Sequence, residues 1–403
     1  MPSLKTLFLT LPAAVLAIPH ISRRQTAQTI PGKWIARIED NEVLSTVLST
    51  VLDTTGVQSI GNYSVGNVKG FNFEGDDAVL DILQEMGAIK SVEPDTRMYA
   101  NVPLHVRQFG GNGTTNGTLA TQQGATWGLN RISHKESGGS SYVYDRSAGE
   151  GTFIYIIDTG INSKHTEFTS RVTLGASFIE DSEGEDDQGH GSHCAGTAAG
   201  TVYGVAKKAN LIAVKVLGAD GSGSNSGVLQ GIDWAVQHAT ENGHLDRAVL
   251  SMSLGGTYSK TTNDAIVEAT NAGAFITVAA GNEGEDASNS SPASAPSACT
   301  VGATNLQDTR ADFSNFGKAL DIFAPGEDIT SAWIGSSSAK NTISGTSMAT
   351  PHIAGLAAYL IALEGSKSPA ALCQRIQELA QKDVVEDVGS GSPNLLAYNG
   401  NGA

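Results

Sequence analysis

The sequence is poor in charged residues, in bases and in cysteine. Charged side chains make up 16% of the 403 residues, below the roughly 25% typical of soluble proteins. The formal charge of −16, from 41 acids against 25 bases, excludes a protein built to bind nucleic acid or an anionic membrane surface. Three cysteines are too few for a disulfide scaffold and too scattered for a zinc ribbon, and they leave at least one thiol unpaired.

Long apolar runs are also missing beyond the first residues. Residues 1–17 read MPSLKTLFLTLPAAVLA, in which Lys5 precedes an apolar run that ends in small residues. This pattern predicts a secretory signal peptide at 1–17, and a buried helix of the mature fold is the alternative. No other stretch approaches the length of a membrane span, so we expect a secreted, extracellular protein with no membrane contact. In an exported chain the glycosylation sequons supply acceptors at Asn62, Asn112, Asn116 and Asn289.

Glycine and apolar residues are plentiful, and the chain divides into two blocks. The 47 glycines and a hydrophobic content of 40% indicate many tight turns around a large core. Residues 30–98 show a small α+β pattern, in which KWIARIED alternates as a strand and AVLDILQEM has the spacing of an amphipathic helix. The stretch 109–124, FGGNGTTNGTLATQQG, has no periodicity and is a natural place for proteolytic nicking.

Beyond this linker the pattern changes. Apolar runs typical of strands (TFIYIID, LIAVKVL, AVLSMSL, AFITVAA) alternate with helical stretches such as VLQGIDWAVQHATENG and NDAIVEATNAG. The alternation predicts an α/β fold with a largely parallel central sheet and helices on both faces. The small α+β domain precedes it.

Three short motifs contain residue types that can carry chemistry. Asp158 ends an apolar strand, where ligands gather in open α/β sheets. His190 lies between glycines in DDQGHGSHCAGT, and His193 follows without the intervening Glu of a zinc motif, so we expect no metal pair. Ser347 begins a strongly apolar helix, whose free N–H groups can stabilise an oxyanion. Taken singly, Asp158 could equally be a turn aspartate, and Ser347 would be interpreted as a helix cap. A lone histidine is usually structural, but one between glycines after an acidic loop favours a function.

Taken together, the motifs have the order Asp, His, Ser, which is the order in subtilisin. A serine hydroxyl becomes a good nucleophile only when a base removes its proton and a carboxylate orients that base. Residues 120–403 resemble the subtilisin-type serine peptidases, most of all the proteinase K group of secreted fungal enzymes. The motifs that carry the resemblance are YDRSAGEGT, IIDTGI, GHGSHCAGT, SLGG, AAGN and SGTSMATPH. The resemblance implies that Asp158 orients His190, that His190 is the general base and acid, and that Ser347 attacks the carbonyl. It assigns Asn282, with the Ser347 N–H, to the oxyanion hole.

The resemblance also implies where substrate binds. Two extended segments should pair with the peptide backbone, Gly221, Ser222 and Gly223 on one side and Ser253, Leu254 and Gly255 on the other. The second segment and Ala279, Ala280 and Gly281 should wall the pocket for P1, the residue before the scissile bond, so we expect broad specificity with a preference for large apolar or aromatic P1 residues. The run 180–187 holds six acids in eight residues. It is either a solvated loop or a feature that favours basic substrates and raises the pKa of His190.

For the cysteines and metals, the resemblance implies a disulfide between Cys299 and Cys373 and a buried free thiol at Cys194. It implies one structural Ca²⁺, bound by the carbonyls of Pro296 and Ala298 and the carboxylate of Asp321. The family's weaker second calcium site should be lost, because Lys135 stands where a hydroxyl ligand is expected. No catalytic cofactor is expected.

Residues 18–119 resemble the inhibitor-type propeptide of the same family, which assists folding and plugs the active site. The resemblance implies that the linker end near Leu119 lies in the cleft as a product and that the mature chain starts at about Ala120. We therefore expect a monomeric endopeptidase, made as a self-processing zymogen, that acts on proteins and peptides and is inhibited by its own propeptide. The alternatives are a binding protein that has lost turnover, although no catalytic residue is missing, and an esterase, against which the peptide-pairing segments argue.

Overall fold

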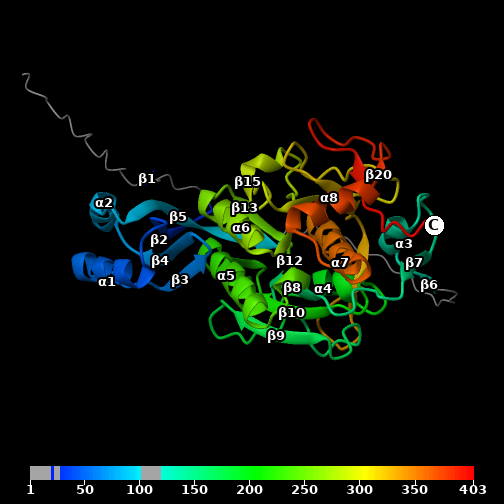
Figure 1. Ribbon diagram of the computed structural model, residues 1–403, viewed down its shortest axis with the longest axis horizontal. Helices are drawn as coiled ribbons and strands as arrows, with labels where there is room; N and C mark the ends of the chain where they lie inside the picture. Colours follow the sequence, from blue (N-terminus) through cyan, green and yellow to red (C-terminus); the bar gives the residue numbers. More distant parts are fainter. Residues whose placement is uncertain (1–19, 22–27, 101–118) are drawn as a thin grey trace, which may run out of the picture.

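The computed structural model describes two units that lie side by side (Figure 1), over residues 20–21, 28–100 and 119–403. The predicted signal peptide at 1–17 lies outside the described residues.

The N-terminal unit is an antiparallel sheet with two helices packed on it, which confirms the predicted small α+β unit. Strand order is β5-β2-β4-β3, and β1 adds in parallel to β5. The elements are β1 (His20–Ile21), β2 (Thr29–Ile38), α1 (Leu44–Thr55), β3 (Gly61–Val65), β4 (Val68–Glu74), α2 (Asp77–Glu85) and β5 (Ile89–Ala100).

Local sequence explains the ends of these helices. Helix α1 ends at Gly56, whose φ of 73° suits a glycine. Asp76 caps α2, since its carboxylate accepts hydrogen bonds from the N–H groups of Ala78 and Val79. The alternate apolar residues of the strands meet both helices in one small core, which includes Trp34, Val47, Phe71, Phe73, Leu80 and Leu83.

The larger unit is built on a nine-stranded sheet in the order β20-β21-β17-β16-β14-β12-β8-β10-β9. Every neighbouring pair is parallel except β20 with β21, so the prediction of a largely parallel sheet is confirmed. The strands are β8 (Phe153–Asp158), β9 (Val172–Ser177), β10 (Asn210–Lys215), β12 (Ala248–Met252), β14 (Phe275–Ala279), β16 (Cys299–Thr304), β17 (Ile322–Pro325), β20 (Gln381–Lys382) and β21 (Leu395–Leu396).

Helices cover both faces of this sheet, as the alternating pattern predicts. One buried apolar cluster joins the sheet to α4 and α7, and the other joins it to α5 and α6. The larger helices are α3 (Trp127–Ser133), α4 (His190–Ala199), α5 (Asn225–Glu241), α6 (Lys260–Ala272), α7 (Thr346–Glu364) and α8 (Pro369–Leu379). Shorter elements are β6 (Leu119–Gln123), β7 (Ser141–Asp145), β11 (Ser222–Ser224), η1 (Leu245–Arg247), β13 (Leu254–Thr257), η2 (Ala287–Asn289), β15 (Ser290–Ser291), β18 (Ile329–Ala332) and β19 (Lys340–Ile343).

Helix α7 is the central helix of the larger unit. It is apolar and long enough to cross a membrane, but 89% of its apolar window is buried inside the protein. Its contacts with α4 and with strands β12, β14 and β16 identify it as a core helix, and no other helix among the described residues passes the same test of length and composition.

The two units share a second sheet. Strand β5 of the N-terminal unit extends between β11 and β13 of the larger unit and pairs antiparallel with both. In Figure 1 the end of β5 accordingly reaches away from α1 and α2 into the larger unit, beside β13.

Candidate active site

Asp158 and His190 form a buried pair at the carboxyl edge of the sheet. Asp158 is the last residue of β8, and His190 is the first residue of α4. The imidazole Nδ1 lies 2.7 Å from Asp158 Oδ1, and neither side chain is exposed. Gly189 precedes the histidine with a φ of 110°, and a side chain there would clash with the Trp333 ring, which explains the glycine before His190.

The environment of His190 favours its protonated form. Burial is the largest single effect and lowers the pKa of this imidazole, but the Asp158 carboxylate and the Cys194 thiol together outweigh it, so the pKa of His190 lies well above its ordinary value. The Cys194 thiol lies 3.9 Å from Nδ1. Burial raises the pKa of that thiol.

Ser347 is the second residue of α7 and is fully buried. Its hydroxyl donates to the Ser253 carbonyl at 2.8 Å, and its own carbonyl accepts from the Ser253 hydroxyl at 2.9 Å. Cys194 Sγ contacts both His190 Nδ1 and the Ser347 carbonyl, so the histidine and the serine are neighbours. The structure therefore brings the three predicted triad residues into one site.

Several polar atoms at this site are buried without a protein partner. Among the described residues, His190 Nε2, Asp158 Oδ2 and Asn282 Nδ2 make no hydrogen bond. Such atoms are costly to bury, and two of them belong to the groups that would receive a proton and stabilise an oxyanion. A reacting peptide would give His190 Nε2 and Asn282 Nδ2 hydrogen-bond partners.

Asn282 is held with its amide nitrogen free. Its Oδ1 accepts hydrogen bonds from the Thr346 N–H and the Thr346 hydroxyl, both at 2.9 Å. The carbonyl half of the side chain is thereby tied to the start of α7, whose first N–H groups lack partners within the helix. The amide nitrogen of Asn282 and the N–H groups at the start of α7 are therefore both left as donors near Ser347, as an oxyanion hole requires.

The two predicted substrate segments lie on either side of β5. Tyr99 pairs with Ser222 on one side and with Gly255 on the other. Met98 pairs with Gly223, and Ala100 pairs with Leu254 and donates its N–H to the Gly221 carbonyl at 2.9 Å. The cleft therefore holds a strand of the chain's own N-terminal unit.

This occupant differs from the predicted one. The sequence predicts that the linker end near Leu119 fills the cleft, but Leu119 begins β6 and pairs with Asp145 of β7. Residues 97–100 take that place instead. The difference arises because the position of β5 depends on long-range docking between the two units, which local composition does not reveal.

The predicted P1 wall follows β14. Ala279 ends that strand, and Ala280 and Gly281 continue it as buried residues. Gly281 has a φ of 104° and donates its N–H to the Thr346 hydroxyl. Ser253 lies directly before β13, so the small-residue wall and the nucleophile are joined through direct hydrogen bonds.

Part of the acidic run 180–187 has a structural role that sequence reasoning missed. Asp186 accepts hydrogen bonds from the Thr159 hydroxyl and from backbone and side-chain donors of residues 188–192. Asp187 pairs at 2.6 Å with Lys215, whose side chain is fully buried. These contacts fasten the start of α4, and hence His190, to the end of β8. The residues that point inward could not be identified from composition alone.

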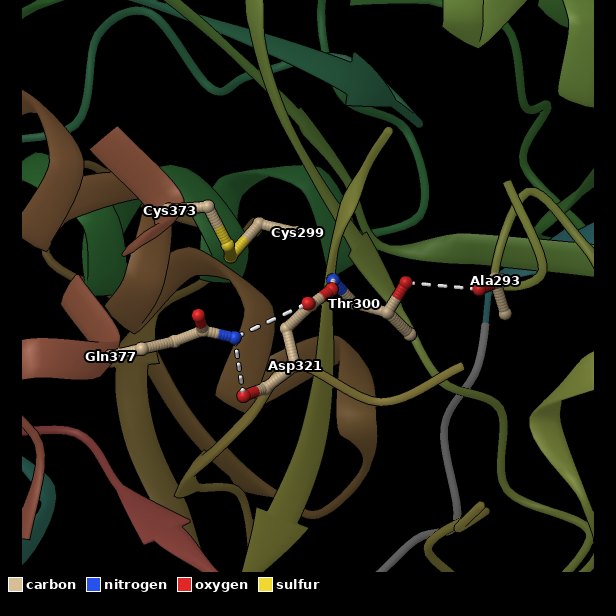
Figure 2. Close-up of a disulfide and its surroundings, with 6 residues drawn as sticks. All are labelled: Ala293, Cys299, Thr300, Asp321, Cys373 and Gln377. Carbon is tan, nitrogen blue, oxygen red and sulfur yellow. Dashed lines mark hydrogen bonds between the residues drawn. A yellow bond between two sulfur atoms is a disulfide. The ribbon is translucent and has the colours of Figure 1, made fainter. Parts of the chain in front are cut away.

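The disulfide cysteines and the predicted calcium ligands lie together at α8, whereas Cys194 is on α4. Cys299 and Cys373 form a disulfide, and Cys194 is a buried free thiol. Asp321 is close to this disulfide (Figure 2), accepts the Thr300 N–H at 2.8 Å and receives a longer contact from the Gln377 amide. Burial raises the pKa of Asp321 to about 6.

Two of the four predicted glycosylation sites lie among the described residues. Asn62 on β3 and Asn289 in η2 are exposed, whereas Asn112 and Asn116 lie outside the described residues.

Comparison with known proteins decides the family. The model of the subtilase family of peptidases matches residues 149–402. The chain belongs to the subtilase family. It is 52% identical over 341 residues to subtilisin-like protease 2 of Pseudogymnoascus destructans, with 85% of this chain and 80% of the relative covered. It is 55% identical over 282 residues to the cuticle-degrading protease of Metarhizium anisopliae, with 70% and 72% covered.

Other relatives extend over the whole chain. Alkaline protease 1 of Aspergillus flavus is 44% identical over 421 residues, with 100% of both chains covered. Among solved structures, a cold-adapted subtilisin-like serine proteinase matches with a TM-score of 0.65 and 41% identity, over 68% of this chain and 98% of its own. The subtilase described here is accordingly a serine protease with the predicted α/β fold, and proteins are its substrates.

Proposed function

We propose that this subtilase is a secreted endopeptidase, made as a self-processing zymogen, with broad specificity and a preference for large apolar or aromatic P1 residues. The observation that supports this best is the seating of β5. A strand of the same chain lies between β11 and β13 with backbone pairing on both edges, as a peptide substrate would lie. Backbone pairing binds peptides with little demand on their sequence, which favours broad specificity.

The site geometry supports a specific division of labour. Once the Ser347 hydroxyl turns from the Ser253 carbonyl to His190, Nε2 takes its proton as Oγ attacks the carbonyl carbon, and Asp158 stabilises the imidazolium through Nδ1. Asn282 Nδ2 and the first turn of α7 donate to the oxygen that becomes negative. His190 then returns the proton to the leaving amine. In the second half of the reaction water, activated by His190, attacks the ester formed with Ser347 and releases the carboxylic acid product.

Contacts between the units support the assignment of residues 18–119 as the inhibitory propeptide. Asp95 of β5 accepts from the Ser226 N–H and hydroxyl at the start of α5, and Glu93 accepts from the Ser259 hydroxyl that caps α6. Arg37 forms an ion pair with Asp264 of α6. With β5 in the cleft and the small sheet docked on α5 and α6, substrate has no access to the pairing segments.

The assignment of residues 18–119 as a propeptide predicts how the chain matures. Changing Ser347 to Ala should leave a secreted chain that keeps residues 18–119, because no nucleophile remains to cut it. A mature-sized product from this variant would reject self-cleavage as the only route. N-terminal sequencing of the wild-type product tests the boundary at about Ala120 against a cut nearer to Ala100, where the cleft strand ends.

For the structural cation we propose one Ca²⁺, held by the carbonyls of Pro296 and Ala298 and by Asp321. These residues line one cavity of about 950 Å³. Asp321 is a half-buried carboxylate without an ion pair among the described residues. Such a group favours a cation, and an all-oxygen ligand set suits Ca²⁺. The ion would neutralise Asp321 and tie β17 to the segment before β16. The exposed Lys135 argues against the second ion.

Secretion, a monomeric state and glycans at the predicted sequons complete the proposal. Relatives are alkaline and cuticle-degrading proteases, and residues 1–17 carry the signal pattern. The exposed Asn62 and Asn289 are available as acceptors. A glycan on Asn62 would leave with the propeptide, whereas one on Asn289 would stay with the mature enzyme.

A further inference from the structure

The surroundings of the disulfide contain three metal-binding groups. The sulfur atoms of Cys299 and Cys373 and a carboxylate oxygen of Asp321 all lie within 4.8 Å of one another. Figure 2 shows the carboxylate beside the disulfide, with the Gln377 side chain next to it. Dithiol reduction of the bridge would leave two thiols and one carboxylate close together.

These groups come from rigid elements. Cys299 is the first residue of β16, Asp321 directly precedes β17, and Cys373 is on α8. Strands β16 and β17 are paired neighbours in the central sheet, and the Cα atoms of the two cysteines are 6.0 Å apart. The groups would therefore stay close together when the sulfur–sulfur bond is broken.

The donor set selects a class of metal. Thiolates are soft ligands that favour Zn²⁺ and similar ions, and Asp carboxylate oxygen is also a common zinc ligand. A disulfide offers no thiolate, so the oxidised protein keeps only the oxygen ligands that suit Ca²⁺. Water can supply a fourth ligand, because the cavity that Cys373, Asp321 and Gln377 line is open to solvent and has a volume of about 950 Å³.

We propose that the reduced protein holds a soft divalent metal such as Zn²⁺ at Cys299, Cys373 and Asp321. A dithiol supplies two electrons and two protons to open the disulfide, and the metal then displaces a proton from each thiol as it binds. Metal and disulfide exclude each other, since thiolates bound to the ion are not free to be oxidised. The site uses no catalytic residue, and it shares Asp321 with the proposed Ca²⁺, so the two ions compete for that carboxylate.

The test uses the full chain with Ser347→Ala, so that self-digestion cannot interfere. The protein is reduced with dithiothreitol, freed of reductant without oxygen, and titrated with CdCl₂, because Cd²⁺ bound to thiolates absorbs in the ultraviolet by charge transfer. We expect one Cd²⁺ per chain with this absorption and release of about two protons per ion. Oxidised protein should show neither signal.

Two variants serve as controls. The double variant Cys299→Ser/Cys373→Ser keeps Cys194, so any absorption that remains in it belongs to that thiol. Asp321→Asn keeps both thiols and should weaken Cd²⁺ binding on the order of tenfold or more. An absorption no larger than that of the double variant, or equal affinity with Asp321→Asn, would overturn the proposed site.

Reduction could also unfold the chain, and circular dichroism decides that case. Because an ion that binds only the folded form shifts the equilibrium toward it, Cd²⁺ should then restore the native spectrum. Failure of Cd²⁺ to do so would refute the site. Restoration in the double variant as well would equally refute it.

Discussion

The isosteric change Asn282→Asp tests the oxyanion hole most sharply. The structure shows Oδ1 anchored by two donors of Thr346 while Nδ2 has no partner. Aspartate keeps an oxygen for the anchor, replaces the donor by a second acceptor and adds a negative charge, so the transition state loses a hydrogen bond and its oxyanion faces a like charge. Loss of one such donor in subtilisin costs about 10²–10³ in kcat, or about 2.7–4 kcal/mol.

The assay is steady-state hydrolysis of a chromogenic peptide by mature enzyme, with active sites counted by titration. We expect kcat to fall by at least about 10²–10³ with KM nearly unchanged, because the backbone pairing on β11 and β13 stays intact. Asn282→Ala is the matched control. It removes the donor and also leaves the Thr346 N–H without its acceptor, which should cost about 1–3 kcal/mol of stability. A loss below about tenfold in Asn282→Asp, with normal folding, would refute the assigned role.

Three further predictions concern pH, calcium and the acidic run. Asp158 and Cys194 outweigh burial and raise the pKa of His190, and the base must be neutral, so kcat/KM should rise with pH through a value above about 6.5. A midpoint at or below that value would contradict the paired geometry. Chelation should lower the thermal midpoint of the wild type and leave Asp321→Asn unaffected, and an equal shift in both would reject Asp321 as a ligand. Asp186→Ala should destabilise the protein by about 3 kcal/mol and lower kcat, because five donors lose their acceptor. An unchanged kcat in the folded variant would show that these contacts do not position His190.

The sequence predicted the parts of the molecule that local patterns encode. The parallel sheet follows from apolar runs such as that of β8, and the chemistry of Asp158, His190 and Ser347 follows from small-residue motifs that allow close packing. The disulfide between Cys299 and Cys373 came from resemblance to a family, and the structure contains it.

Long-range docking set the limit of prediction. The run Ile89–Ala100 was readable as a strand, but its seat in the cleft depends on contacts of Glu93 and Asp95 with two distant helices. The inward turn of Asp186 and Asp187 likewise depends on Thr159 and Lys215, which are remote in sequence. A run of acids has the same composition whether its carboxylates face water or a helix.

Covalent labelling tests the central claim most directly. The secreted mature enzyme is treated with a sulfonyl fluoride, the adduct is located by peptide mass spectrometry, and casein hydrolysis is followed on the same samples. A single adduct on Ser347, gained in proportion to the activity lost, is the expected result. Full activity with Ser347 labelled, or loss of activity with Ser347 unlabelled, would contradict the assignment of this serine as the nucleophile.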